Sequence, residues 1–338
     1  MLKMTSVEQK ATFFRELATM VQAGMTIGES LGTIRERMAP GRLRMAAIDA
    51  ADKARRGTPF SDTMELYPDV FSAVEIAMVR AGEQSGHLDR LLGQIATYLE
   101  AEYALRQTIS RETFYPKIVF AFIILFPTVL KGLLAYFGPG GSMLAAILVM
   151  LKGFLGLAAL AVVVIAVYYV IRHLLANSRE LRRGVDTLKL TLPVMGPVVR
   201  RIALAKFSRA LAAMYEAGVS LPRAVGLAAD LTGNAALRDP MKAAVAQLEG
   251  GKGVYEVMRT IPHMDNMALQ MLHTGETTGN IDVMMARVAD HFDEASASSL
   301  KRMTTLIVPI ATIIAGIVVA IMMVQAYSGY FNAIFESQ

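Results

Sequence analysis

Three apolar segments, each long enough to cross a lipid bilayer, constrain this chain more than any other feature of its sequence. They occupy about residues 115–137, 153–171 and 304–327. A helix needs about 20 mostly apolar residues to cross the hydrocarbon core, because each residue adds roughly 1.5 Å to its length. The composition agrees, since 54% of the 338 residues are hydrophobic and only 19% are charged. We therefore predict an all-α integral membrane protein with three transmembrane helices.

Basic residues are distributed unevenly around these segments, and this predicts an orientation. Residues 1–114 contain 14 Lys and Arg residues and residues 172–303 contain 17, whereas residues 132–151 and 328–338 contain none. Loops rich in Lys and Arg stay in the cytoplasm. We therefore expect both large segments and the N-terminus in the cytoplasm, and the tail at 328–338 in the periplasm. A short periplasmic loop at 138–152 is expected to hold a turn and an interfacial helix.

The basic pI of about 9.3 does not indicate nucleic-acid binding. The segment 1–114 contains 14 basic and 15 acidic residues, which gives a net charge of −1. The segment 172–303 contains 17 basic and 13 acidic residues, which gives a net charge of +4. This excess flanks the apolar segments and suits the anionic headgroups of a lipid bilayer.

The chain has no cysteine, which excludes disulfides and thiolate metal sites.

An internal repeat with an offset of 193 or 194 residues covers most of the chain. The stretch "MVRAGEQSGHLD" at 78–89 returns as "MLHTGETTGNID" at 271–282, and residues 13–31 match residues 207–225. One residue is gained or lost between Pro68 and Gly82 in the first copy relative to the second. Each copy is predicted to be a cytoplasmic domain of about 100 residues followed by a transmembrane helix.

Within each copy the apolar residues have a helical period, which predicts a bundle of about six helices. Gly24 and Gly218 suit left-handed helix ends, and Thr26 and Ser220 suit the start of the next helix. The remaining helices are expected at 42–56, 60–66, 70–81 and 87–114, and at 235–249, 254–260, 265–274 and 280–303.

A second corner, G-E-x-x-G-x-[LI]-D, also occurs in both copies. We expect Gly82 to end a helix with a left-handed cap, Gly86 to leave room for the next helix, and Asp89 to lie in that helix's first turn, where a carboxylate is favoured. The second copy repeats these residues as Gly275, Gly279 and Asp282.

The glutamates of this corner, Glu83 and Glu276, have no assigned role in that pattern. Three interpretations are open. Each carboxylate either accepts hydrogen bonds from unpaired backbone amides at its own corner, contacts a partner, or shares a divalent cation with Asp89 or Asp282.

Nothing in the sequence indicates catalysis. The five histidines form no metal-ligand motif, no G-x-S-x-G occurs, and "GGKG" at 250–253 lacks the spacing of a phosphate-binding loop. We therefore expect no catalytic residue, no cofactor and no metal, and any ATP hydrolysis belongs to a partner. A transporter or channel is disfavoured by the near absence of charge within the apolar segments. A membrane-bound signalling scaffold remains an alternative.

The order of motifs resembles a known family. A helical domain with "LATMVQAGMTIGESL", then "RAGEQSGHLDRLLGQIATYLE", then "YP" before an apolar segment, followed by a second copy, is similar to the GspF/PilC family. These are inner-membrane platform proteins of bacterial type II secretion and type IV pilus machines. The usual Glu-Pro of the last span is Val308-Pro309 here. The first domain starts near residue 5, which favours the type IVb pilus branch.

The resemblance implies a platform that couples a cytoplasmic assembly ATPase to the insertion of pilin or pseudopilin subunits into a filament. It also implies contacts with other inner-membrane assembly proteins, and a homo-oligomer that matches a symmetric motor. Two helices are expected to run from the cytoplasmic bundle into the bilayer, with kinks at Pro116 and Pro309. Such helices can carry a rotation or tilt of the bundle into the membrane.

Overall fold

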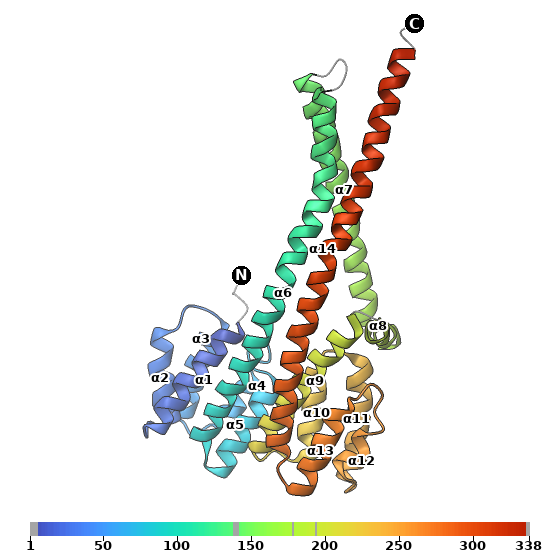
Figure 1. Ribbon diagram of the computed structural model, residues 1–338. Helices are drawn as coiled ribbons and strands as arrows, with labels where there is room; N and C mark the ends of the chain where they lie inside the picture. The colour runs from blue at the N-terminus through green and yellow to red at the C-terminus, as the bar shows by residue number, and fades with distance from the viewer. Residues whose placement is uncertain (1–5, 138–141, 178, 193–194, 336–338) are drawn as a thin grey trace. The chain divides into compact units, whose positions relative to one another are not determined.

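The computed structural model describes residues 6–137, 142–177, 179–192 and 195–335 (Figure 1). These residues form fourteen α-helices and no β-strand, in agreement with the predicted fold class. The chain divides into two compact units. Residues 1–108 and 183–296 form one, which we call the bundle unit, and residues 109–182 and 297–338 form the other, which we call the apolar unit.

Each copy of the repeat contributes six helices, as the sequence predicts. The first copy comprises α1 (Val7–Gln22), α2 (Ile27–Arg37), α3 (Arg42–Ala54), α4 (Phe60–Glu65), α5 (Ala73–Ser85) and α6 (Leu88–Phe137). The second comprises α9 (Met195–Glu216), α10 (Leu221–Leu231), α11 (Ala235–Glu249), α12 (Val254–Met258), α13 (Asn266–Thr278) and α14 (Ile281–Phe335). The helix α8 (Arg179–Thr191) precedes the second copy and is absent from the prediction.

Capping boxes fix where three helices of the first copy begin. Ser6, Thr26 and Ser72 each accept a hydrogen bond from the backbone amide three residues later, and the Gln or Glu side chain there bonds back. Both exchanges satisfy amides that lack a partner within the helix. In the second copy Ser220 occupies the start of α10, but its side chain makes no capping hydrogen bond, so its predicted capping role is wrong.

The single-residue difference between the copies lies in the loop before α5 and α13. Pro68 and Pro262 keep the offset of 194, whereas the N-cap residues Ser72 and Asp265 have an offset of 193. The second copy therefore has one residue fewer between these points. Its shorter loop contains His263 with φ of 65°, a left-handed conformation that few residues other than glycine adopt.

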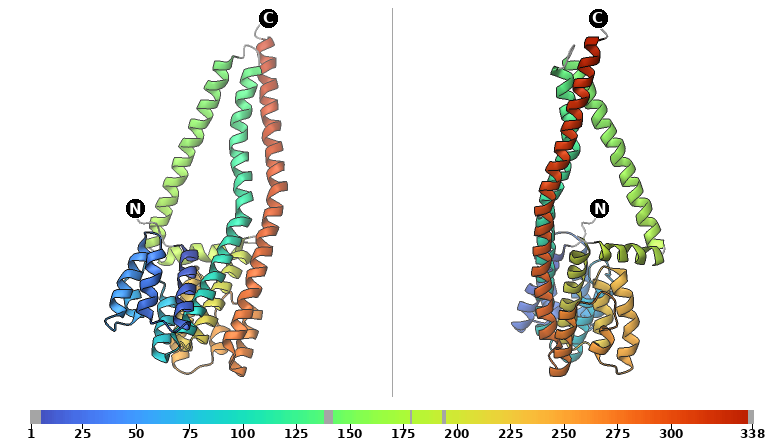
Figure 2. Two further views of the ribbon diagram at one scale, coloured as in Figure 1. Left: turned by 90° about the vertical axis from the view of Figure 1, so that its left-hand side faces the viewer. Right: turned by 45° about the vertical axis from the view of Figure 1, so that its right-hand side comes forward.

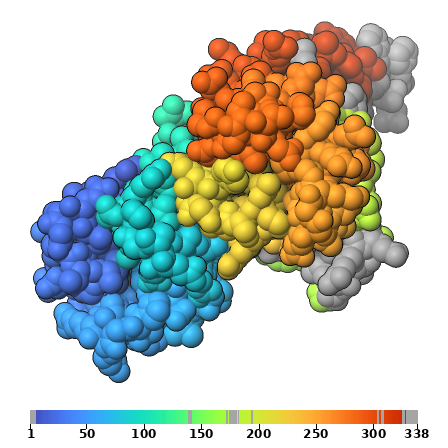
Figure 3. Space-filling view, turned by 90° about the horizontal axis from the view of Figure 1, so that it is seen from below, coloured from blue at the N-terminus to red at the C-terminus, as the bar shows by residue number. Residues whose placement is uncertain are grey.

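One continuous apolar core joins the two copies in the bundle unit. Phe14, Leu17 and Phe60 of the first copy and Phe207 and Leu211 of the second are all fully buried members of it. Figure 3 shows α5 of the first copy (cyan) against the α9–α10 segment of the second (yellow), and the residue contacts agree. The two copies thus fold together through burial of apolar surface.

The apolar unit contains the candidate membrane spans. Two described helices are long and apolar enough to cross a membrane, α6 and residues Met143–Val170 of α7 (Met143–Asn177). The apolar stretch Pro309–Val324 of α14 is shorter. Figure 2 shows α6 and α14 as single helices along their whole length, so the chain does not leave the helix at position 116 or at Pro309.

The stretch between the first two apolar segments differs from its prediction. Helix α7 starts at Met143 and runs unbroken to Asn177, so residues 143–152 belong to the same helix as the second apolar segment rather than to a separate interfacial helix. Residues 143–152 contain neither proline nor glycine, so no helix-breaking residue separates them from the second apolar segment. The predicted turn at 138–141 lies outside the described residues.

Small residues allow α6 and α7 to approach closely within the apolar unit. A methyl group added at Gly132 would lie 2.3 Å from Met150 Cγ, and one added at Gly153 would lie 2.5 Å from Thr128 Cγ2. A larger residue at either position would therefore force the side chain of Met150 or Thr128 to move. On α14, by contrast, a Cβ added at Gly316 would meet no atom of another described helix within 4 Å.

Candidate functional site: the corners and the seam between the two repeats

The structure assigns Glu83 a partner far from its own corner. Its carboxylate accepts hydrogen bonds from the backbone N–H of Phe60, from the N–H of Ser61 at 3.3 Å, and from the Ser61 hydroxyl. Phe60 is the first residue of α4, whose N-cap residue, Pro59, has no side chain able to cap. Glu83 therefore supplies the capping carboxylate that α4 lacks.

The second copy uses the same device. Glu276 accepts hydrogen bonds from Val254 N–H at 2.7 Å and Tyr255 N–H at 2.9 Å, at the start of α12. The N-cap residue is Gly253, and a Cβ there would lie 2.8 Å from Glu276 Oε1. Of the three interpretations, the structure thus favours binding of unpaired amides. The prediction that these amides belong to the glutamate's own corner is wrong, because they lie 21 to 23 residues upstream.

The two glycines of this corner have the opposite roles to those predicted. Gly86 ends α5 in the left-handed conformation, with φ of 73°, and Gly279 ends α13 in the same way. Gly82 lies inside α5, and a Cβ added to it would be 3.2 Å from Leu88 Cα. Gly275 lies inside α13, and a Cβ added to it would be 2.9 Å from Ile281 Cα. The first glycine of the motif therefore provides room for the next helix, and the second provides the cap.

The other predicted residues lie as follows. Gly24 and Gly218 have φ of 90° and 80°, as expected for left-handed corners. Asp89 and Asp282 lie in the first turns of α6 and α14. Position 116 lies within α6 and Pro309 within α14. These residues therefore form two separate sets of corners and two positions in the long helices, rather than one site.

A duplicated ion pair marks a region that the sequence analysis missed. Arg15 on α1 binds Glu100 on α6 through two hydrogen bonds of 2.9 and 2.7 Å. The equivalent residues in the second copy are Arg209 on α9 and Asp293 on α14, and they also form an ion pair. The first pair is exposed, with 45% and 48% of the side chains accessible, whereas Arg209 is only 9% accessible.

Arg209 is buried because it lies against the first copy. Its Nη1 atom is 3.9 Å from Glu102 Oε2 on α6, and Lys206 Nζ lies 3.3 Å from the other carboxylate oxygen. Glu102 is 10% accessible. We call this boundary, formed by α1 and α6 of the first copy and α9 and α14 of the second, the seam.

The pKa of Asp293 is raised to about 6, chiefly by burial and in part by the nearby carboxylates of Asp290 and Glu102, against the attraction of Arg209. Burial also raises the pKa of Tyr98 on α6. Among the described residues, the buried side-chain atoms without a hydrogen-bond partner include both polar atoms of Gln94, Asp293 Oδ1 and Ser296 Oγ. Because such atoms cost free energy, the seam is packed less favourably than the apolar core.

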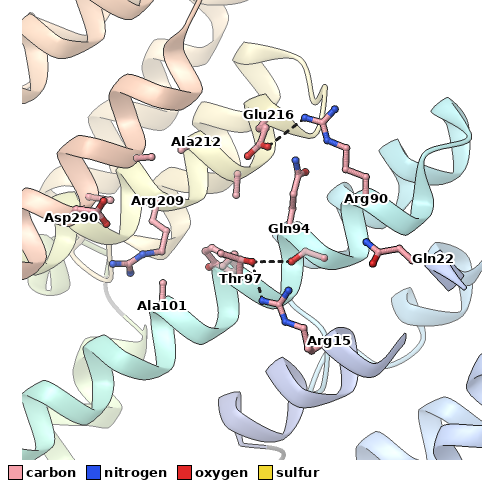
Figure 4. A pocket seen from close by; sticks show the side chains of 15 residues that line it. Arg15, Gln22, Arg90, Gln94, Thr97, Ala101, Arg209, Ala212, Glu216 and Asp290 are labelled. Atoms are coloured by element: carbon pink, nitrogen blue, oxygen red, sulfur yellow. Dashed lines mark hydrogen bonds and ion pairs between the residues drawn. The ribbon is translucent and has the colours of Figure 1, made fainter. Parts of the chain in front are cut away.

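A cavity of about 510 Å³ opens along the seam (Figure 4). Equivalent positions of the two copies line it in pairs, which are Arg15 with Arg209, Gln22 with Glu216, Gly93 with Ala286, and Thr97 with Asp290. Matching surfaces that face each other in this way are typical of an approximate two-fold axis. The two copies are therefore joined like the subunits of a dimer, with polar side chains around a shared cavity.

The sequence did contain a signal for part of this arrangement. Arg15 and Arg209 are equivalent in the repeat, and so are Glu100 and Asp293, so an acidic residue is kept opposite an arginine in both copies. The burial of one pair and the exposure of the other were not predictable, because burial depends on how the copies pack.

These features define a class of protein: an all-helical chain with a duplicated six-helix unit, in which each copy leads into an apolar helical segment. A profile of the family described as "Type II secretion system (T2SS), protein F" matches it twice, at residues 13–135 and 207–329. The chain belongs to this family. The two matches also confirm the internal repeat.

Curated relatives cover nearly the whole chain. The chain is 29% identical over 335 residues to the type IV pilus assembly protein PilC of Thermus thermophilus, covering 96% of this chain and 82% of the relative. It is 28% identical over 332 residues to PilC of Pseudomonas aeruginosa, covering 95% and 89%. It is also 28% identical over 330 residues to the type II secretion system protein F of Vibrio cholerae, covering 94% and 81%.

Proposed function

We propose that this chain is an inner-membrane platform protein of a type IV pilus or type II secretion machine. In this role it couples a cytoplasmic assembly ATPase to the insertion of pilin or pseudopilin subunits into a filament. It works as a homo-oligomer with other inner-membrane assembly proteins. Family membership and the names of its relatives support this proposal. The type IVb branch stays a prediction, since relatives of both machines match.

The proposed topology follows from charge. Both copies of the repeat lie in the cytoplasm, residues 115–137, 153–171 and 304–327 cross the membrane, and the C-terminus is periplasmic. Residues 132–151 and 328–338 contain no Lys or Arg, whereas the two large segments contain 14 and 17. This asymmetry supports the orientation, because basic loops are retained in the cytoplasm.

One structural observation carries the coupling mechanism. Two carboxylates of the seam, the buried Glu102 on α6 and the partly buried Asp293 on α14, lie on the same helices that contain the apolar segments at 115–137 and 304–327. A change at the seam therefore acts directly on two helices that continue into the apolar unit. Polar, incompletely paired interfaces separate at lower cost than apolar cores, so we propose that ATPase-driven motion acts on the seam.

The test is in-cell crosslinking in the native host, followed by detergent purification of the tagged chain and mass spectrometry of the captured proteins. The proposal expects an assembly ATPase of the secretion or pilus class together with pilin-like subunits. Their reproducible absence, with only unrelated proteins captured, would overturn it. The control is a tagged membrane protein of similar size without this family's domain, which should capture neither class.

A further inference from the structure

Helix α8 has an apolar face that the bundle unit does not cover. Leu181, Val185, Leu188 and Leu192 follow the spacing i, i+4, i+7 and i+11, which places them on one side of a helix. Leu181, Leu188 and Leu192 are 54%, 60% and 42% accessible. Three large apolar side chains on one exposed face are costly in water.

The opposite side of α8 is fixed to the second copy. Asp186 is buried, and its carboxylate accepts a hydrogen bond of 3.0 Å from Ala235 N–H at the start of α11. The Asp186 carbonyl oxygen accepts one of 3.1 Å from Asn234 Nδ2. Leu190 packs against the apolar core. The side of α8 that faces the bundle unit is therefore set by specific bonds, and its leucine face is directed away from them.

Charge and position in the chain indicate what covers this face. Residues 179–192 contain four basic residues, Arg179, Arg182, Arg183 and Lys189, and two acidic ones. Lys189 forms an ion pair of 2.8 Å with Asp186, whose carboxylate also caps α11, so the remaining basic charge of the helix belongs to its arginines. A single residue separates α8 from the end of α7, which contains a candidate membrane span. A short helix with an apolar face and basic flanks, next to a membrane span, has the composition of helices that lie in the headgroup region.

We propose that α8 is a membrane-surface helix that binds anionic phospholipid. Its leucine face enters the boundary between headgroups and acyl chains, and its basic side chains bind the lipid phosphates. The inference rests on the proposed membrane location of the chain. It adds a defined lipid-binding surface, which Asp186 connects to the start of α11 in the second copy.

The absence of cysteine allows a direct test on the full chain. Single-cysteine variants Leu188→Cys, on the leucine face, and Thr191→Cys, exposed beside it, are labelled with a nitroxide in vesicles of phosphatidylethanolamine and phosphatidylglycerol. Collision with oxygen reports lipid, and collision with a water-soluble nickel chelate reports water. We expect the oxygen-to-nickel ratio to be several-fold higher at position 188 than at 191, and to fall at 188 in phosphatidylcholine vesicles.

Equal ratios at the two positions, both favouring nickel, would overturn the proposal. So would protection of position 188 from both reagents together with spin-spin broadening, because a second copy of the chain would then cover the face. An unchanged ratio in phosphatidylcholine would overturn the preference for anionic lipid. A third variant, Val163→Cys in α7, separates this inference from the proposed function. If that label lies in lipid while position 188 is in water, the chain is inserted and only the role of α8 is wrong.

Discussion

Replacing Arg209 by methionine should destabilise the protein much more than the same change at Arg15, although the two residues are equivalent in the repeat. Arg209 lies between the buried carboxylate of Glu102 and the partly buried carboxylate of Asp293. Removing it leaves Asp293 without its cation, whereas Glu102 keeps Arg106 at 2.9 Å and Lys206 at 3.3 Å. The loss should therefore lie near the lower end of the about 3–5 kcal/mol that breaking a buried ion pair costs. Arg15 and Glu100 are both nearly half exposed, and such surface pairs contribute about 0–1 kcal/mol. The expected difference is therefore about 3 kcal/mol.

The cost of the Arg209 change should also depend on pH. The pKa of Asp293 in the folded protein is about 6, above the ordinary value of about 3.9 for aspartate. The folded state therefore binds this proton more tightly than the unfolded state, and Asp293 destabilises the fold above about pH 6 but not below about pH 4. Without Arg209 the carboxylate is still more costly to ionise, so lowering the pH to 5 should recover part of the lost stability.

The assay is denaturant unfolding of the full chain in detergent micelles at pH 7.5 and pH 5, monitored by circular dichroism. Arg209→Met should lower the free energy of unfolding strongly at pH 7.5 and less at pH 5. Arg15→Met should lower it only slightly at both pH values. Equal losses for the two variants would refute the reasoning, because the seam would then contribute no more than an exposed surface pair.

Three further variants test other parts of the structure. Glu83→Ala should lower the free energy of unfolding by about 1–2 kcal/mol, because two amides of α4 lose their acceptor; the same unfolding assay measures it. Gly82→Ala should cost about 1–3 kcal/mol, because the new methyl group meets the backbone of α6; its unfolding midpoint reports this. The double variant Pro116→Ala and Pro309→Ala should reduce filament assembly or secretion in the native host at unchanged protein abundance.

Each of these variants has a matched control in the chain. Glu36→Ala removes an exposed carboxylate that accepts no hydrogen bond from the residues that the structure describes, and it should leave stability unchanged within error. Gly156→Ala adds a methyl group in α7 at a position where no other helix, as far as the structure describes the chain, comes within 4 Å. Pro40→Ala changes an exposed proline between α2 and α3. If Glu36→Ala costs as much as Glu83→Ala, or if the double proline variant assembles filaments at full rate, the corresponding argument fails.

Local signals in the sequence predicted most of the helical architecture. The apolar period gave the six helices of each copy, and the Ser or Thr three residues before Gln or Glu marks where α1, α2 and α5 begin. These features depend on interactions between residues only a few positions apart, so they can be derived without knowing the tertiary structure.

Where the prediction was wrong, a non-local contact decided the outcome. Gly82 and Gly86 both suit a left-handed cap, and the close approach of Leu88 to Gly82 selects Gly86. Glu83 caps a helix that starts 23 residues upstream. The seam joins residues of different copies. From the sequence, the basic residues of α8 are assigned to the flank of an apolar segment, and no helix is predicted there. For Glu83 and for the seam, the relevant partner is adjacent in space but distant in sequence, and for Gly82 it lies in the next helix.

The most direct test of the central claim is a deletion in the native host, with surface filaments and secreted proteins measured in the mutant and in strains complemented by wild-type chain or by Arg209→Met at equal abundance. The account predicts that the deletion abolishes filament assembly or secretion, that wild-type chain restores it, and that the Arg209 variant restores it only in part. A deletion strain with normal filaments and normal secretion would contradict the account.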